Sequence, residues 1–171
     1  LDNNIHTSLI LYGHRWASTA SEKSTSCEWV ELAAAFSSDN KNAIVNTLSS
    51  QSPVGWTPIQ KSLEMANEEI QKYSKQGDEN IILLVSDGEE TCGGDPVNIA
   101  REITSKNTNT YIDVIGFNVD GAIQEQLQNI ASNGKGSYFN VKTRLDFENV
   151  FQKTQSFLEA KSCGASKSAI E

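Results

Sequence analysis

One carboxylate follows a stretch that is expected to be a buried strand. Residues 81–85 (Ile-Ile-Leu-Leu-Val) are five consecutive aliphatic residues, and Ser86, Asp87 and Gly88 come directly after them. Such a run is typical of a strand buried on both faces of a parallel sheet. Open α/β sheets bind ligands at the carboxyl ends of their strands. We therefore expect Asp87 to be a functional residue, with a simple Asp-Gly turn as the alternative.

Cysteine is the second residue type that could do chemistry here. The three cysteines are Cys27, Cys92 and Cys163, and they form neither a Cys-x-x-Cys pair nor, with His6 and His14, a zinc-binding spacing. Cys27 and Cys92 lie in polar stretches, and a disulfide between them would stabilise the fold by on the order of 4 kcal/mol through loop closure. We favour this disulfide, and hence an oxidising compartment, over three free thiols in a cytosolic protein. Cys163 is expected on a flexible tail.

The composition indicates one acidic globular domain. The chain has 171 residues, a formal net charge of −8 and a sequence pI near 4.8. This length is enough to bury a core. Lysine and arginine are scattered, which argues against nucleic acid as a partner because phosphate binding needs clustered positive charge. No apolar run approaches the ~20 residues of a transmembrane helix.

Short apolar runs alternate with helical patterns along the chain. We expect strands at 8–13, 28–36, 81–85, 111–117 and 136–141, with a helix as the alternative for 28–36, and a Ser/Thr-rich loop at 14–26. Helices are expected after an N-cap at Asp39, over 59–73 with Thr57 as cap, after Asp95-Pro96, over 122–131 and over 145–158. This alternation predicts an α/β, Rossmann-like fold with a mostly parallel central sheet and helices on both faces. Residues 1–160 would form the domain and residues 161–171 a polar C-terminal tail.

Three stretches carry a resemblance to a known family. They are Leu11-Tyr12-Gly13-His14-Arg15, Gly55-Trp56-Thr57-Pro58-Ile59, and residues 85–96, which read Val-Ser-Asp-Gly-Glu-Glu-Thr-Cys-Gly-Gly-Asp-Pro. Together they resemble a von Willebrand factor type A (VWA) domain of bacterial secreted or surface proteins. The resemblance covers almost the whole chain. It implies a Rossmann-like sheet with a metal-ion-dependent adhesion site (MIDAS) at the carboxyl ends of the strands.

The resemblance also implies a set of metal ligands. In that family an Asp-x-Ser-x-Ser motif after the first strand, a threonine from a second loop and an aspartate from a third hold the metal, and here Thr57 and Asp87 match the last two. The implied metal is Mg²⁺, with Ca²⁺ or Mn²⁺ as alternatives, and a carboxylate of a protein partner would replace one of its waters. Thr57 and Asp87 alone are too few ligands to hold Mg²⁺ strongly.

The sequence departs from the family pattern at its start. An apolar strand ending in Asp-x-Ser-x-Ser, followed by a long helix, is expected but does not precede the strand at 8–13. We favour a piece of a longer protein, which would also account for the lack of a signal peptide. A second polypeptide that donates the strand is another explanation. The third is a rearranged fold, in which Gly164-Ala165-Ser166-Lys167-Ser168 echoes the Ser-x-Ser part.

These observations favour a binding function. We expect a protein-binding or adhesion module of an extracellular, periplasmic or surface protein, which recognises its partner at the carboxyl edge of the sheet. The alternative is a metal-free structural subunit of a surface assembly, whose missing strand comes from another chain. Enzymatic activity is not expected, because the neighbouring carboxylates of Asp87, Glu89 and Glu90 lack a His, Ser or Cys constellation. His14 is expected to hydrogen-bond within its loop.

Overall fold

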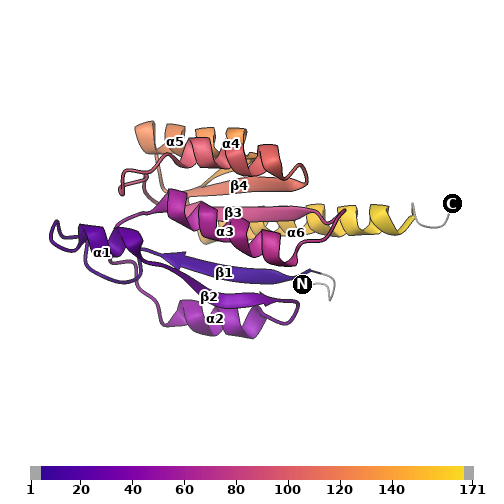
Figure 1. Ribbon diagram of the computed structural model, residues 1–171, viewed down its shortest axis with the longest axis horizontal. Helices are drawn as coiled ribbons and strands as arrows, with labels where there is room; N and C mark the ends of the chain where they lie inside the picture. The colour runs from indigo at the N-terminus through magenta and orange to yellow at the C-terminus, as the bar shows by residue number, and fades with distance from the viewer. Residues whose placement is uncertain (1–4, 168–171) are drawn as a thin grey trace.

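The computed structural model describes the backbone of residues 5–167 and the side chains of residues 5–154 and 156. Strands and helices alternate along most of this part of the chain (Figure 1). In chain order the elements are β1 (Thr7–Tyr12), α1 (Lys23–Glu28), β2 (Val30–Ser37), α2 (Lys41–Ser49), α3 (Ile59–Tyr73), β3 (Asn80–Ser86), α4 (Pro96–Lys106), β4 (Thr110–Phe117), α5 (Gly121–Asn133), β5 (Lys135–Val141) and α6 (Arg144–Lys167).

The strands β3, β4 and β5 form a parallel sheet, with β4 in the middle. The strands β3 and β4 are rich in aliphatic residues because helices cover both faces of the sheet. Ile82 and Leu84 of β3 point into a core shared with α3, α4 and α5, and Ile112 and Val114 of β4 are fully buried there. On the opposite face, Ile115 packs with residues of β5 and α6. The α/β, Rossmann-like fold class is therefore confirmed.

The strands β1 and β2 form a second, antiparallel sheet. Tyr12 pairs with Val30 at one end and Thr7 with Ser37 at the other. We expected a mostly parallel central sheet that lacks the family's first strand; no backbone ladder joins β1 to β3 among the described strands. Instead α3 contacts β1, β2 and β3, and Figure 1 shows it lying in front of both sheets. The Tyr12 hydroxyl adds a bond across the divide, since it donates to the Val85 carbonyl oxygen at 2.9 Å.

Several element boundaries differ from the sequence-based expectations. The short helix α1 lies within the stretch that we expected to be a loop. The N-cap of α2 is Asn40 rather than Asp39, and the Asn40 side chain donates to the carbonyls of Thr7 and Ala35. This side chain therefore ties the start of α2 to both strands of the small sheet.

Two helix ends also differ. The helix α3 begins at Ile59 with Pro58 at the N-cap position, so Thr57 lies one residue before the cap instead of forming it. The helix α6 runs to Lys167, so residues 161–167 of the expected tail are helical, while residues 168–171 lie outside the described part. The backbone of Cys163 is on α6, and its side chain lies outside the described residues.

Candidate functional site at the carboxyl edge of the large sheet

Thr57 and Asp87 lie at the same edge of the molecule. Asp87 follows the last residue of β3, and its side chain is exposed. Thr57 lies just before α3, and its Oγ1 is 3.8 Å from the position that a Cβ on Gly88 would take. Since Gly88 is the neighbour of Asp87, the fold brings the two expected ligands into one region.

The loop that follows Asp87 is fixed by hydrogen bonds to the backbone of Thr57. The Thr57 amide donates to Thr91 Oγ1 at 2.8 Å, and the Thr91 amide donates back to the Thr57 carbonyl at 3.1 Å. Ser86 Oγ bonds to both backbone groups of Gly88, which shapes the turn at the end of β3. These bonds use the main chain of Thr57. No described group makes a hydrogen bond to its hydroxyl, so this oxygen remains available to a ligand.

The carboxylate of Glu90 has a structural task. Its two oxygens accept the backbone amides of Gln60 at 2.9 Å and Cys92 at 2.7 Å. The first of these bonds satisfies an amide at the N-terminus of α3, where a negative charge is also favourable. The amide of Glu90 donates in turn to Gln126 Oε1 of α5 at 2.8 Å. Glu90 therefore holds the loop against two helices.

Asp95 caps the next helix, as the sequence predicts. Its side chain accepts the amide of Asn98 at 3.0 Å, and Pro96 occupies the first turn of α4. The Asp95 amide donates to Gln60 Oε1 at 2.6 Å, so the far end of the loop is again tied to α3. The loop from Asp87 to Asp95 is thus anchored at both ends.

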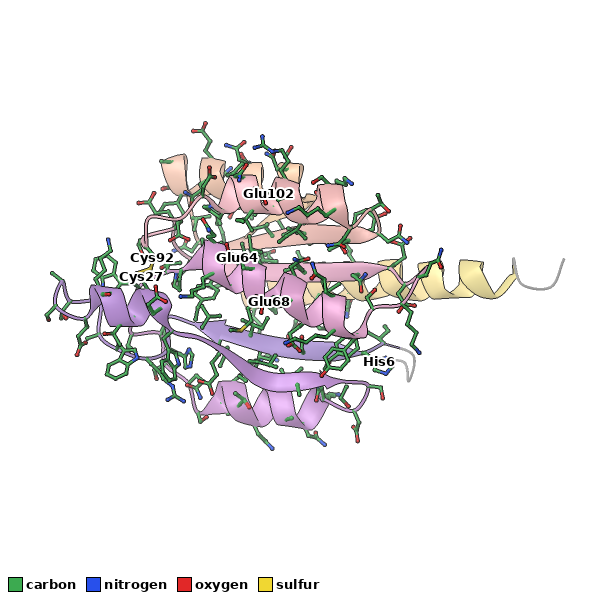
Figure 2. All side chains as sticks on the ribbon, in the orientation of Figure 1. His6, Cys27, Glu64, Glu68, Cys92 and Glu102 are labelled. Carbon is green, nitrogen blue, oxygen red and sulfur yellow. A yellow bond between two sulfur atoms is a disulfide. The ribbon has the colours of Figure 1, made fainter. Side chains whose placement is uncertain are left out.

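The predicted disulfide is present. Cys27 at the end of α1 is bonded to Cys92 in the loop after β3, with the two Cα atoms 5.5 Å apart. Figure 2 shows this bond next to α1, at the carboxyl edge of β3. Because the bridge joins residues 65 apart in sequence, it links the β1–β2 half of the molecule to the loop that carries Asp87.

We expected His14 to hydrogen-bond within its loop, but it contacts Glu31 of β2 instead. Its Nε2 lies 3.0 Å from Glu31 Oε2, and an Arg15 guanidinium nitrogen lies 3.1 Å from the same oxygen. The hydrogen bond from His14 is the main cause that lowers the pKa of the Glu31 carboxyl, and the positive charge of Arg15 adds to it. The His14 side chain is only 5% exposed. It therefore braces the segment after β1 against β2.

The donor set suits a hard cation only in part. The hydroxyl of Thr57 and the carboxylate of Asp87 are oxygen ligands of the kind that Mg²⁺ takes, and Mg²⁺ often keeps several waters beside one or two carboxylates. Among the described residues, no group of three or more His, Cys, Asp or Glu side chains could hold a metal ion. Thr57 and Asp87 therefore fit a metal site only if a further ligand completes it.

Sequence reasoning missed two features close to this edge. Tyr12 packs on the main core, and burial raises the pKa of its phenol to about 12. The tryptophans at 16, 29 and 56 gather around α1 and the segment before α3, although we expected Trp16 in a loop, Trp29 in a strand and Trp56 in the loop before a helix. Their clustering in the first third of the chain is the signal that could have found them.

Comparisons with known proteins agree with this architecture. Residues 2–153 match the family model of the von Willebrand factor type A domain. The uncharacterized protein YwmD of Bacillus subtilis (strain 168) is 32% identical over 160 residues, which are 93% of this chain and 71% of that protein. The uncharacterized protein YwmC of the same strain is 34% identical over 158 residues, or 92% of this chain and 68% of that protein.

Solved structures share the fold at lower identity. The conserved hypothetical protein BatB from Bacteroides thetaiotaomicron superposes with a TM-score of 0.69 at 20% identity, over 94% of this chain and 82% of that one. The VWA domain of SpRpn10 gives a TM-score of 0.54 at 13% identity, over 73% of this chain and 66% of that one. At these identities the likeness concerns the fold alone.

Proposed function

Since this chain belongs to the von Willebrand factor type A domain family, we propose that it is a protein-binding module that engages its partner at the carboxyl edge of the large sheet. The observation that carries the proposal is the convergence of Thr57 and Asp87 at that edge, on a loop anchored to α3 and α5. The module acts by binding rather than by catalysis, since Glu90, beside Asp87, serves backbone amides instead of a substrate.

The binding depends on a divalent cation in this proposal. Thr57 through its hydroxyl and Asp87 through its carboxylate would hold Mg²⁺, or Ca²⁺ or Mn²⁺ in its place. The cation supplies an open coordination position for a carboxylate of the partner. Asp87 is exposed, and the hydroxyl of Thr57 makes no hydrogen bond within the described residues, so both oxygens can reach an ion at little structural cost.

A further strand completes the sheet in this proposal. The Asn80 amide donates to Asn109 next to β4, so the backbone groups of Ile81, Leu83 and Val85 face the other way, toward β1. Of these, the Val85 carbonyl accepts the Tyr12 hydroxyl. Two unpaired strand edges thus face each other, and strand addition satisfies such edges. We propose that an upstream segment or another polypeptide supplies this strand, together with further metal ligands.

The half-covered face of β3 supports strand addition. Leu83 is half-buried and Val85 is 42% exposed, although Ile82 and Leu84, on the other face of the strand, are buried. A strand between β1 and β3, followed by a helix, would cover these side chains.

We propose an extracellular or surface location. The disulfide of Cys27 and Cys92 supports it, since such bonds persist in oxidising compartments. In the part of the chain that the structure describes, no helix is both long enough and apolar enough to cross a bilayer.

The metal site can be tested by titrating the full-length protein with Mn²⁺ and following free Mn²⁺ by electron paramagnetic resonance. Because Thr57 and Asp87 alone are too few ligands for tight binding, we expect weak but saturable binding of one ion per chain in the wild type, no binding by Asp87→Asn and still weaker binding by Thr57→Val. The matched control is Glu89→Gln, which removes an exposed carboxylate two residues away and should bind like the wild type. Equal binding by Asp87→Asn and wild type would refute the metal site.

Sedimentation of the same samples separates the module from the structural alternative. A folded monomer over a wide concentration range supports the binding module. Oligomers at all concentrations, with no monomer, would instead favour a structural subunit in which neighbouring chains exchange strands.

A further inference from the structure

The three tryptophans of the chain share one surface beside the candidate metal site. Trp16 and Trp29 form an edge-to-face pair with ring centroids 6.4 Å apart. Trp56 lies next to them, since its indole N–H donates to the Thr19 carbonyl at 3.2 Å and the backbone before it abuts that of Trp16. Trp16 is 43% exposed and Trp29 38% exposed. We call this set, with Arg15 and Lys23, the tryptophan surface.

The scaffold beneath the tryptophan surface is rigid. Ser26 of α1 is buried, and its Oγ accepts the amide of Trp56 at 2.9 Å. A Cβ on Gly55 would lie 2.6 Å from that oxygen and 2.7 Å from the Arg15 carbonyl oxygen, so the two segments touch where only glycine fits. The disulfide at Cys27 adds a covalent tie. The indoles are thus presented on a fixed frame, which limits the entropy lost on binding.

The backbone of Trp16 is strained. Its φ is +62°, in the left-handed region that bulky side chains rarely adopt. Such conformations cost on the order of 1–3 kcal/mol and persist mainly at functional sites. The strain here holds a large apolar ring in an exposed position, which does nothing for the core. Asn118 and Lys135 share this backbone conformation elsewhere in the fold, so the strain supports a binding role only together with the exposure of the Trp16 ring.

Two cations cover ring faces within the tryptophan surface. The Arg15 guanidinium lies 5.0 Å from the ring centroid of Trp29, and the Lys23 amine lies 4.4 Å from that of Trp56. Arg15 is also paired with Glu31, whereas Lys23 has no ion pair with any described residue. Lys23 therefore offers an uncompensated positive charge at the rim.

These features select a protein partner among the ligands that tryptophan binds. Cations already lie over Trp29 and Trp56, so these two rings offer a sugar less open face than Trp16 does. A net charge of −8 opposes docking to an anionic bilayer. Tryptophan and arginine are, by contrast, the residues most enriched in the energetic centres of protein interfaces.

We propose that the tryptophan surface is a protein-docking site. It seats an aliphatic or proline side chain of the partner against Trp16 and Trp29, with a partner carboxylate facing Lys23. The inference rests on the proposed function, because Trp56 precedes Thr57 in the chain and the surface therefore continues into the candidate metal site. The partner would contact both areas at once.

The test uses random short peptides displayed on phage, selected on the full-length protein in the presence of a metal chelator. The chelator removes any contribution from the metal site. A synthetic peptide of the selected sequence is then titrated by tryptophan fluorescence, which reports on this surface because all three tryptophans lie in it. We expect selected sequences that place Asp or Glu beside an aliphatic residue or proline.

Variants locate the binding. Trp16→Ala should lower the affinity for the peptide by roughly tenfold or more, as at the central residues of other interfaces, and Lys23→Gln should lower it by about threefold. Leu145→Ala removes another exposed apolar side chain, at the start of α6, and should have no effect. Trp16→Phe, checked for an unchanged near-ultraviolet circular dichroism spectrum in the other aromatic bands, guards against a folding defect in the alanine variant.

Three results would overturn the inference. They are selection of no peptide, equal binding by the wild type and both Trp16 variants, and a fluorescence response to chitohexaose or anionic vesicles without one to peptides. Asp87→Asn should leave the peptide affinity in chelator unchanged. The protein can therefore bind the peptide without binding Mn²⁺, or bind Mn²⁺ without binding the peptide, and the two experiments distinguish these cases.

Discussion

Replacing both Cys27 and Cys92 by serine should destabilise the protein substantially. The disulfide closes a loop between residues 65 apart. For a loop of this length, the lost constraint on the unfolded chain corresponds to about 4 kcal/mol of unfolding free energy. For a domain of this size, each kcal/mol shifts the melting temperature by about 2–4 °C, so the expected decrease is about 8–16 °C.

The position of the disulfide supports this estimate of the unfolding free energy. Cys27 and Cys92 join two parts of the molecule that share no backbone ladder, namely α1 and the loop after β3. That loop keeps its own anchors at Glu90 and Asp95 without the bridge. The native state should therefore survive, and the loss should come mainly from the greater freedom of the unfolded chain.

The assay is thermal unfolding followed by far-ultraviolet circular dichroism, at neutral pH and without metal. A Cys163→Ser background is needed, because a free thiol at 163 could pair with a remaining cysteine. Cys163→Ser alone serves as the control and should melt like the wild type. A reducing agent should lower the melting temperature of this control to that of the triple variant. A decrease below about 2 °C would refute the reasoning that the bridge restricts the unfolded chain.

Three further predictions concern other elements. Burial raises the pKa of Tyr12 to about 12, whereas an exposed phenol titrates near 10; the unfolded state thus loses its proton first, and the free energy of unfolding should fall as the pH rises from about 10 to 12. Because burial also raises the pKa of Tyr138, Tyr12→Phe should reduce this decrease in pH-dependent urea unfolding without removing it, and an unchanged slope would contradict the burial of the phenol. Gly136→Ala would place a Cβ against the Ile112 carbonyl and should lower the free energy of unfolding in urea by about 2 kcal/mol or more. Gly88→Ala makes only an ordinary contact with Thr57 and should change that free energy by no more than about 0.5 kcal/mol. Similar losses at the two glycines would count against the packing argument. Asp95→Ala removes the cap of α4 and should lower the free energy of unfolding by about 1 kcal/mol. Asp95→Asn should keep most of that stability, because the Asn side chain can accept the same hydrogen bond; an equal loss in both variants would contradict the capping role.

Local sequence signals predicted the large sheet well. The aliphatic run at 81–85 and the cap at Asp95-Pro96 each specify their element through short-range chemistry, and the structure confirms both. The disulfide followed from two cysteines in polar stretches, and it too is present. In each case the residues that decide the structure are neighbours in sequence or a pair with few alternatives.

The small helix and the split of the sheet did not follow from such signals. The segment Lys23–Glu28 has no apolar periodicity, and it forms a helix because Ser26 is buried against Trp56 and Cys27 is bonded to Cys92. Both partners are distant in sequence. The separation of β1 from β3 depends on strand pairing across the whole fold, which no local pattern encodes.

The sequence named two expected ligands of the candidate site but not the groups that support them. Asp87 was found from its place after the aliphatic run and Thr57 through the family resemblance, and the fold brings them to one edge. The role of Glu90 as an anchor for amides of α3 and its own loop was not foreseen, because a carboxylate in a loop has the same sequence signature whether it binds an ion or a backbone amide. Only the folded geometry distinguishes the two.

The bridging position of α3 has a consequence for local unfolding. The strand β4 is enclosed, with Ile112, Val114 and Ile115 fully buried, whereas β1 is half-buried along its length and is joined to the large sheet through α3 and the Tyr12 hydroxyl. Such a molecule should open in two cooperative units, with the amides of β1 and β2 exchanging their hydrogens faster than those of β4. A strand bound between β1 and β3 would merge the two units. Equal protection of both sheets would then be the signature of the completed domain.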